Sequence, residues 1–415
     1  MTISRLLCLV VAIACAGAAP SVARAQEPET IAEIRVHGNH TTPETEILSI
    51  AALVPGEPAS QTHLAEAERR LRASGRFADV EIRRRYRSIA DPSEILVVLL
   101  VDEHDAVSDD NLTPGPLARL RSAGMWLPIV GYADGYGLTY GARVSIIEPF
   151  GSRSRLSMPL TWGGERKAAL EVERTFGQVL ARGSAGVSRR VNPYYDQPDT
   201  RREIAATIER AFRPWLRAGA NARVGRVTFA EDNAWHRAGG VQLPFDTRVD
   251  PSFPRNAVHA TIGVEQIHFR DGRSARATAD VHGYAALGGS VVLALRGAIV
   301  RAGAALPPSE QVLLGGSNTL RGYRAGHRAG DGLALISAEA RVPLTSPLSV
   351  GRLGVKAFVD AGTTWDAGTR LRDQRFERGI GGGVYFGATL VTANVDVAWP
   401  EQGKPRVHAT LGVRF

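Results

Sequence analysis

Cysteine is almost absent from this sequence of 415 residues, and the absence excludes several classes of chemistry. The two cysteines, Cys8 and Cys15, both lie near the N-terminus. The chain from Gln26 onward can therefore form no disulfide, no thiolate metal site and no cysteine nucleophile. Histidines show no paired metal-ligand spacing, and neither a Gly-x-Ser-x-Gly elbow nor a Gly-Lys-Ser/Thr phosphate loop occurs. We predict no enzyme activity, no catalytic residue, no metal and no cofactor.

Long hydrophobic runs are missing as well. Beyond the first 25 residues, the richest apolar segment is 95–101, which has the length of a strand. A helix that crosses a membrane needs roughly 20 predominantly apolar residues. We therefore predict no transmembrane helix after residue 25.

The N-terminus is typical of a secretory signal peptide. Arg5 supplies a positive charge, residues 6–14 form an apolar stretch too short to span a bilayer, and residues 23–25 read Ala-Arg-Ala. We expect residues 1–25 to be a signal peptide, and the alternatives are a transmembrane anchor or a lipoprotein modified at Cys15. An exported chain without a helical anchor is either soluble outside the inner membrane or a β-barrel.

Lysine is nearly as scarce as cysteine. It occurs only at Lys167, Lys356 and Lys404, so the formal net charge of +8 is carried almost entirely by arginine. A basic balance can indicate nucleic-acid binding. Here the arginines follow strand-like spacing and form no basic tail, which favours a polar surface or lumen, and we predict no nucleic-acid partner. Aromatic residues make up only 7%, so any aromatic girdle must be sparse.

Residues 29–104 are predicted to form a small β-α-α-β-β domain. A strand at 31–37 ends in Gly-Asn turn chemistry. Two helices with apolar positions at helical spacing follow, with Thr42 and Ser60 as their expected N-caps. A strand that starts at Phe77 and the apolar run described above complete the domain. The alternative is an unrelated two-layer α+β domain.

The character of the sequence changes after a linker predicted at 105–124. From 125 to 415, segments of about ten residues alternate apolar with polar side chains, which is the pattern of a transmembrane β-barrel. A soluble β-sandwich also alternates, but it must protect its edge strands. We predict sixteen antiparallel strands, at 125–132, 136–148, 154–162, 167–175, 181–191, 202–212, 215–229, 239–248, 257–269, 275–286, 290–300, 333–344, 350–361, 378–386, 390–399 and 406–415.

The connections between these strands alternate in length. Short turns at one end of the barrel are expected to alternate with longer outer loops at the other end. The longer loops are predicted at 192–201, 230–238, 301–332 and 362–377. The strand predicted at 257–269 slips in phase at 265–266, Glu-Gln, and this slip predicts either a β-bulge or a wrongly placed strand boundary.

Several motifs in this order resemble the POTRA-plus-barrel superfamily of bacterial outer-membrane assembly factors, the BamA/TamA-like and two-partner-secretion transporter group. In the front domain the POTRA-like pattern includes Val36-x-Gly38-Asn39 and Gly75-x-Phe77-x-x-Val80. The barrel motifs are Asp246-Thr247-Arg248-x-Asp250-Pro251, Leu314-Gly315-Gly316-Ser317-Asn318-Thr319-Leu320-Arg321-Gly322-Tyr323, Glu339-x-Arg341-x-Pro343, Phe358-x-Asp360-x-Gly362 and the terminal Phe415. The resemblance implies a mainly β fold: a 16-stranded antiparallel transmembrane barrel preceded by one α+β POTRA domain.

The resemblance also implies two functional sites. In the family, an Arg-Gly-aromatic motif at the tip of the sixth outer loop folds back into the lumen. Alternation places Glu339 and Asp360 on the inward faces of the two strands that follow this loop. We therefore predict a lumenal clamp formed by Arg321, Gly322, Tyr323, Glu339 and Asp360. The family's first and last strands pair weakly as a lateral seam, predicted here to include Trp126, Leu127, Leu411, Val413 and Phe415.

By this resemblance the protein is an insertase or translocase in the bacterial outer membrane, with its POTRA domain in the periplasm. Its expected partners are outer-membrane lipids, client polypeptides bound in extended form at a POTRA strand edge, and periplasmic accessory proteins. A two-partner-secretion-type transporter and a passive channel are the alternatives. One front domain is fewer than the main insertase carries, which suggests a narrow range of clients. The sequence does not identify a protein or lipid as the client.

Overall fold

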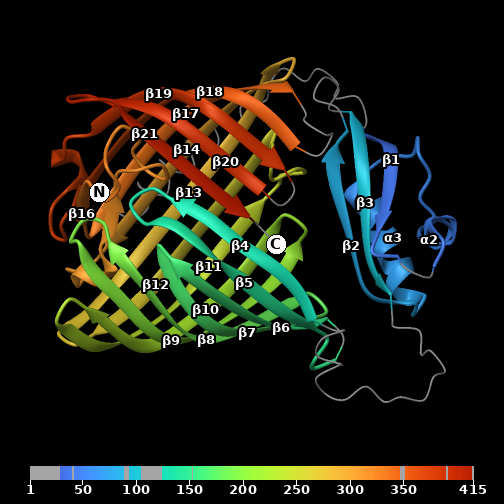
Figure 1. Ribbon diagram of the computed structural model, residues 1–415, viewed down its shortest axis with the longest axis horizontal. Coiled ribbons are helices and arrows are strands. Elements are labelled where there is room, and N and C mark those ends of the chain that lie inside the picture. The colour runs from blue at the N-terminus through green and yellow to red at the C-terminus, as the bar shows by residue number, and fades with distance from the viewer. Residues whose placement is uncertain are drawn as a thin grey trace.

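The computed structural model describes residues 29–39, 42–87, 93–103, 124–151, 153–345, 351–388 and 391–413. These residues form a small α+β front domain and a large β-barrel (Figure 1). The predicted signal peptide and all but the last residue of the predicted linker lie outside the described residues. No described helix is both long and apolar enough to cross a membrane.

The front domain has the predicted β-α-α-β-β order. Its elements are β1 (Thr30–His37), α2 (Glu44–Ala51), α3 (Gln61–Ala73), β2 (Phe77–Tyr86) and β3 (Glu94–Glu103). The sheet order is β1-β3-β2, with β3 parallel to β1 and antiparallel to β2. Apolar side chains such as Ile47, Leu71 and Leu99 are fully buried between helices and sheet.

One of the two predicted helix caps is confirmed. Ser60 precedes α3, and its hydroxyl oxygen accepts a hydrogen bond from the backbone N–H of His63 at 3.2 Å. Thr42 does not cap α2, because that helix starts at Glu44 and Pro43 is the residue before it. The Thr42 N–H instead donates to the Glu103 carboxylate at 2.8 Å, which ties the start of the helical segment to the end of β3.

The barrel closes with sixteen antiparallel strands, as predicted. Its first eight strands are β4 (Gly124–Ala133), β5 (Gly137–Ile147), β6 (Ser154–Gly163), β7 (Glu165–Phe176), β8 (Val179–Asn192), β9 (Gln197–Arg213), β10 (Leu216–Phe229) and β11 (Asp232–Asp246). The other eight are β12 (Ala257–Phe269), β13 (Gly272–Gly288), β14 (Val291–Ala302), β17 (Gly332–Thr345), β18 (Gly351–Trp365), β19 (Glu377–Ala388), β20 (Val391–Pro400) and β21 (Arg406–Val413). Neighbours in sequence are neighbours in the wall, so one antiparallel sheet is wound into a closed cylinder.

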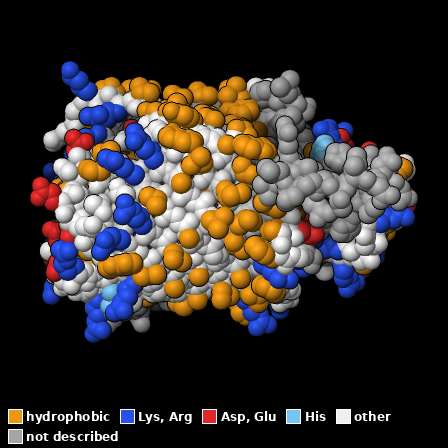
Figure 2. All heavy atoms as spheres, turned by 60° about the horizontal axis from the view of Figure 1, so that its bottom comes forward, with side chains coloured by type: hydrophobic (Ala, Val, Ile, Leu, Met, Phe, Trp, Pro, Cys, Tyr) orange, Lys and Arg blue, Asp and Glu red, His pale blue; other side chains and the backbone are white. Residues whose placement is uncertain are grey.

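Alternation along each strand separates the outer wall from the lumen. On β18, Val355 and Val359 are 39% and 48% exposed, whereas Lys356 and Asp360 between and beside them are buried. Apolar side chains on an outward face suit contact with lipid, and polar side chains suit an enclosed lumen. Figure 2 shows hydrophobic side chains over the barrel wall toward the front-domain end, with Lys and Arg gathered toward the opposite end.

Two of the predicted long outer loops are wrong. The loop predicted at 192–201 is shortened by strands that end at Asn192 and resume at Gln197. The loop predicted at 230–238 is a tight turn between Phe229 and Asp232. The hydrophobic pattern marks only the part of a strand that faces lipid, whereas backbone pairing continues beyond it into polar sequence.

Both alternatives predicted for the slip at Glu265-Gln266 are wrong: there is no β-bulge, and the strand has its predicted bounds, Ala257–Phe269. Both residues keep regular partners on β13, opposite Arg276 and Ala275, without a register shift. The apparent slip arises because Ile267, on the inward face, is fully buried against residues of the long loop that follows β14. An apolar residue packed inside the lumen therefore breaks the apolar-out pattern while the backbone stays regular.

Candidate functional site

The long loop, residues 303–331 between β14 and β17, folds against the inward faces of the strands. It contains the 3-10 turn η1 (Pro308–Glu310) and a small hairpin of β15 (Val312–Leu314) and β16 (Arg328–Gly330). Leu314 and Leu320 are fully buried against the first residues of β17. These apolar contacts hold the loop in one conformation and position its tip beside polar residues of the wall.

Arg321, at the tip of the long loop, is clamped by two carboxylates. Its Nε and one terminal nitrogen contact the two oxygens of Asp360 at 2.7 and 2.8 Å, and the other terminal nitrogen contacts Glu339 at 2.6 Å. Ser337 accepts a further hydrogen bond at 3.2 Å. The guanidinium also lies 3.3 Å from the ring centroid of Phe358. A planar fork on a carboxylate is a directional contact, so this arrangement fixes the orientation of the loop tip.

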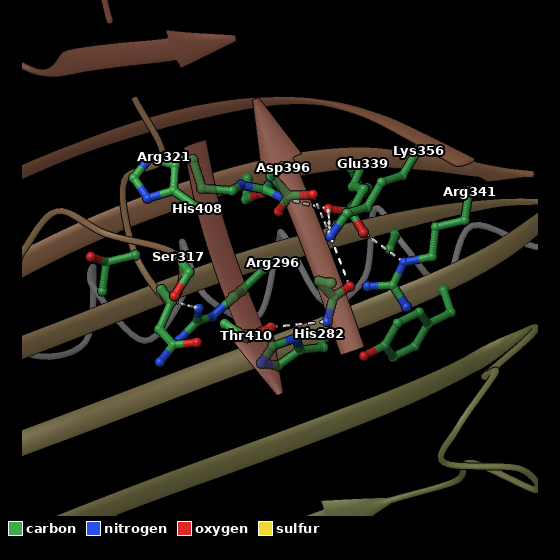
Figure 3. A pocket seen from close by; sticks show the side chains of 17 residues that line it. His282, Arg296, Ser317, Arg321, Glu339, Arg341, Lys356, Asp396, His408 and Thr410 are labelled. Atoms are coloured by element: carbon green, nitrogen blue, oxygen red, sulfur yellow. Dashed lines mark hydrogen bonds and ion pairs between the residues drawn. The ribbon is translucent and has the colours of Figure 1, made fainter. Parts of the chain in front are cut away.

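Charges of opposite sign are paired throughout this buried cluster. Burial by itself would lower the pKa of Arg321, but hydrogen bonds and charge from Asp360 and Glu339 raise it overall. Lys356 pairs with Asp396 at 3.0 Å, and Arg341 pairs with Glu339 at 2.7 Å. Figure 3 shows Arg321, Glu339, Arg341, Lys356 and Asp396 around one cavity. The volume of this cavity is about 380 Å³. Opposite charges within hydrogen-bond distance compensate for the loss of solvent.

Gly322 and Tyr323 contact a different part of the wall from the carboxylates. The Gly322 N–H donates to His408 Nε2 at 2.9 Å. Gly322 has a φ of +95°, and a Cβ there would lie 2.9 Å from the backbone nitrogen of Pro400, so only glycine fits. Tyr323 donates its hydroxyl proton to the Arg378 carbonyl at 3.2 Å. The structure thus brings Arg321, Glu339 and Asp360 together and places the other two predicted residues against β19 to β21.

A second cluster of charged residues, built around a carboxylate, was not predicted from the sequence. Glu310, in η1, is buried and contacts Arg201 and Arg223 at 3.0 Å each. Arg276 and His236 lie within 3.6 Å of the same carboxylate. Burial would raise the pKa of Glu310, but hydrogen bonds and positive charge from these neighbours lower it overall. The long loop is therefore anchored to β9–β13 as well as to β17 and β18.

Asp396 was not predicted as a member of the Arg321 cluster either, although the alternation along its strand indicates its direction. It alternates with outward-facing Val395 and Val397, which predicts that it points into the lumen. Its distance of 3.5 Å from Arg321 depends on how β20 lies beside β19 and on the path of the long loop. For the Glu310 cluster no comparable signal exists, because its arginines come from three separate strands.

The seam between the first and last strands is short. Among the described residues, β21 and β4 share two register pairs, Leu411 with Tyr132 and Gly412 with Gly131. The two strands are offset, so the predicted seam residues Trp126 and Leu127 lie in a part of β4 that pairs with β5 alone among the described residues. Val413 ends β21, and Phe415 lies outside the described residues.

The front domain contacts the barrel mouth through Arg352 at the start of β18. Its guanidinium donates to the Tyr86 carbonyl of β2 at 3.0 Å and pairs with Asp250 at 3.2 Å. A cavity of about 610 Å³ lies beside this contact, between β2 and the turns of the barrel. Asp250, in the predicted motif at 246–251, thus lies where the two parts of the chain meet.

Comparison with known families identifies both parts. Residues 133–415 match the Omp85 superfamily domain. The chain belongs to the Omp85 superfamily. Residues 29–104 match the surface antigen variable number repeat, the POTRA domain. This Omp85 protein is therefore an outer-membrane barrel whose POTRA domain lies in the periplasm, as the sequence motifs predicted.

Solved structures with a similar fold include BamA and CdiB proteins. BamA from Haemophilus ducreyi lacking POTRA domains 1–3 has a TM-score of 0.60 and 15% identity, covering 92% of this chain and 84% of that one. CdiB from Escherichia coli has a TM-score of 0.52 and 12% identity, covering 95% and 92%. CdiB from Acinetobacter baumannii gives 0.51 and 12%, covering 93% and 74%. No curated protein matches the Omp85 chain significantly. At these identities the likeness concerns the fold alone.

Proposed function

We propose that this Omp85 protein is an outer-membrane insertase that receives client polypeptides at its POTRA domain and releases them sideways through the β4–β21 seam. The observation that carries the proposal is the short pairing between these strands. Two register pairs join β21 to β4, whereas every other neighbouring pair in the barrel shares at least six among the described residues. The seam is thus the place where the wall opens at least cost.

The free-energy cost of separating two strands supports the seam as the place where the barrel opens. A backbone hydrogen bond contributes on the order of 1 kcal/mol net, so separation of a two-pair ladder costs a few kcal/mol. Separation of a ladder of six to fourteen pairs costs several times more, and it leaves more backbone groups without partners in lipid. A barrel built this way opens first between β21 and β4. The exposed β4 edge can then pair with an incoming strand.

The lumen favours insertion at the seam over free passage. The long loop is held at Arg321 on one arc of the wall and at Glu310 on another. A segment fixed at two sites obstructs the channel, which argues against a passive pore. The proposed activity makes and breaks no covalent bond.

The POTRA sheet supplies the docking edge in this proposal. Within the order β1-β3-β2, strands β1 and β2 are the edges, and an extended segment can add to an edge by main-chain hydrogen bonds. The cavity beside β2 lies between the POTRA domain and the barrel mouth. A client bound there is close to the periplasmic end of the barrel and to the surrounding outer-membrane lipids.

A reversible lock across the seam tests the function. Tyr132 and Leu411 are register partners, and directly opposed Cβ atoms lie roughly 4.5–5.5 Å apart, near the range a disulfide spans. In the double variant Tyr132→Cys/Leu411→Cys, oxidation should abolish insertion of an unfolded eight-stranded outer-membrane barrel into proteoliposomes, and reduction should restore it. The matched control is Val241→Cys/Val264→Cys, an opposed pair on β11 and β12, whose disulfide should leave insertion unchanged.

The alternatives give different outcomes in the same vesicles. A secretion-type transporter that passes its client through the lumen keeps its activity when the seam is locked. A passive channel inserts no client in either state and shows steady conductance. Movement of a fluorescent phospholipid in place of the polypeptide, blocked by the same lock, would assign lipid as the client. Full client insertion with the seam disulfide formed would overturn the proposal.

A further inference from the structure

His408 contacts both the long loop and the turn that follows the first strand of the seam. It belongs to β21, its side chain is buried, and its Nε2 accepts the hydrogen bond from the Gly322 N–H at 2.9 Å. Its Nδ1 lies 2.6 Å from the Asp134 carboxylate, in the turn that follows β4. Figure 3 shows His408 beside Arg321 in the cavity at the loop tip. One imidazole ring thus connects the loop motif, the last strand and the turn after the first strand.

The hydrogen-bond roles assign one tautomer to this ring. Nε2 accepts from a backbone N–H, so it carries no proton. Nδ1 therefore carries the proton and donates it to the Asp134 carboxylate. Both ring nitrogens are used, and each contact fixes the ring orientation that the other requires. Loss of either partner leaves the ring free to rotate away from the remaining one.

The contact between His408 and Asp134 lies at the end of the hydrogen-bonded ladder between β4 and β21. The last register pair toward the end of the barrel remote from the POTRA domain joins Leu411 to Tyr132. Asp134 and His408 lie just past that pair, where β4 has already turned toward β5. The side chains therefore extend the contact between β4 and β21 beyond the backbone pairing, at the end where the long loop docks.

The long loop also packs closely on the same turn. A Cβ at Gly135 would lie 2.3 Å from Cβ of Ala325, and a Cβ at Gly316 would lie 3.3 Å from the Asp134 carboxylate. Loop and turn thus approach each other without space for an additional methyl group. A shift of the loop tip must move this turn or separate from it.

We propose that His408 is a positioning residue that couples the long loop to the lateral seam. With the loop docked, Gly322 holds the ring so that it donates to Asp134 and closes the seam. When the loop leaves its clamp, Nε2 loses its donor, the ring loses its orientation, and the link to Asp134 weakens. This latch rests on the proposed function, because it specifies how the release step at the seam is controlled.

Spin labels across the seam test the latch in proteoliposomes without any client. Nitroxides at Leu138→Cys and Lys404→Cys, in a full chain whose Cys8 and Cys15 are replaced by serine, report the separation of the first and last hairpins. We expect Arg321→Ala and His408→Ala each to raise the population of long distances about tenfold, a change that corresponds to about 1.4 kcal/mol. The double variant should show no further rise, because both changes break the same chain of contacts.

Two conservative variants separate coupling from simple destabilisation. His408→Asn places an amide where Nδ1 lies, so it can donate to Asp134 without reaching Gly322. Because this variant has no contact with Gly322, its seam distances should no longer respond to Arg321→Ala. His408→Gln extends toward Gly322 and loses Asp134, so its seam should open as far as that of Asp134→Ala. The matched control is His282→Ala, which removes another lumenal histidine, paired with Asp280 at 3.1 Å on β13, and should leave the distances unchanged.

The spin-label distances test the latch without requiring that the protein inserts clients. A seam that responds equally to Arg321→Ala with and without His408 would overturn the latch, even if the protein inserts clients. A latch that behaves as described in a protein that inserts no client would refute the insertase and leave the coupling intact. Each variant is first checked for a folded band in unheated electrophoresis, so a misfolded barrel is not mistaken for an open seam.

Discussion

Arg321 and Asp360 form a two-point ion pair, in which two guanidinium nitrogens contact the two carboxylate oxygens at 2.7 and 2.8 Å. The Asp360 side chain is buried on β18, and Arg321 lies at the tip of the long loop. The Arg321 backbone N–H also donates to Asp360 at 3.2 Å. Side chain and main chain of one loop residue are thus held by one carboxylate, which makes this pair the main anchor of the loop tip.

Arg321→Ala and Asp360→Ala should each release the loop tip. Removal of one partner of a shielded ion pair costs roughly 3–5 kcal/mol, because the other charge is left buried without compensation. Protease protection of the long loop should fall in both variants, and the double variant should be no worse than either single one. The matched control is Arg324→Ala, three residues along the loop, whose exposed side chain donates a hydrogen bond to the Pro193 carbonyl at 2.9 Å. Purely additive losses would rule out a coupled pair.

Arg321→Lys should restore little of this protection. An ammonium group has no planar fork, so it cannot bind both Asp360 oxygens and Glu339 at the same time. It also loses the flat contact with the Phe358 ring. We expect loop protection close to that of Arg321→Ala in the same protease assay. Protection equal to that of the unsubstituted protein would show that charge alone, without geometry, anchors the loop.

Glu310→Gln should release the other anchored part of the loop. Arg201, Arg223 and Arg276 would then lie around a neutral amide, and their mutual repulsion would lose its compensation. Protease cleavage should increase around residues 303–311 and leave the region of Arg321 protected. Glu401→Gln, which removes an exposed carboxylate paired with Arg375, is the control and should change neither region. Equal cleavage at both regions would show that the loop has a single anchor.

Acid should leave the Glu310 anchor intact over a wide range of pH. Its folded-state pKa is lowered, so its contribution to stability is fully present above the unfolded pKa of about 4.3 and is lost as pH falls through the folded value. Loop protection near residue 310 should therefore stay constant from pH 7 to about 5. Proteolysis with an acid-tolerant protease measures it. A loss near pH 6 would mean that another group, and not Glu310, controls this contact.

Deletion of residues 29–104 should abolish insertion of clients without preventing the barrel itself from folding. The barrel closes through its own sixteen strands, so the truncated protein should keep its sheet content in circular dichroism. Client insertion into proteoliposomes should be lost, because no strand edge remains to receive the client. Full client insertion by the truncated barrel would remove the POTRA domain from the proposed function.

The closed barrel should resist detergent until it is heated. All strand edges of the wall are paired around the ring except along the seam, so unfolding requires many hydrogen bonds to break together. An unheated sample should migrate faster in electrophoresis than a boiled one. Identical migration, combined with weak sheet signal in circular dichroism, would contradict a closed barrel.

Several features were already determined by the sequence. The period-two alternation placed Lys356, Phe358 and Asp360 on one face, and the structure confirms that all three are buried inside the barrel. The number and order of strands also followed from this pattern, because each strand must present apolar side chains to lipid. Alternation failed where strands extend beyond the membrane, as at Asn192 and Asp232, since no lipid constrains the side chains there.

Only the tertiary structure decided which inward residues meet. Asp134 and His408 are 274 positions apart, and Arg201 and Glu310 are 109 apart. Their contacts depend on the stagger between strands and on the path of the long loop. Alternation specifies which face of the wall a side chain occupies, but not its position along the barrel axis relative to residues of a distant strand. Closure of the barrel sets those positions, and with them the offset of β4 and β21 that leaves the seam with two register pairs among the described residues.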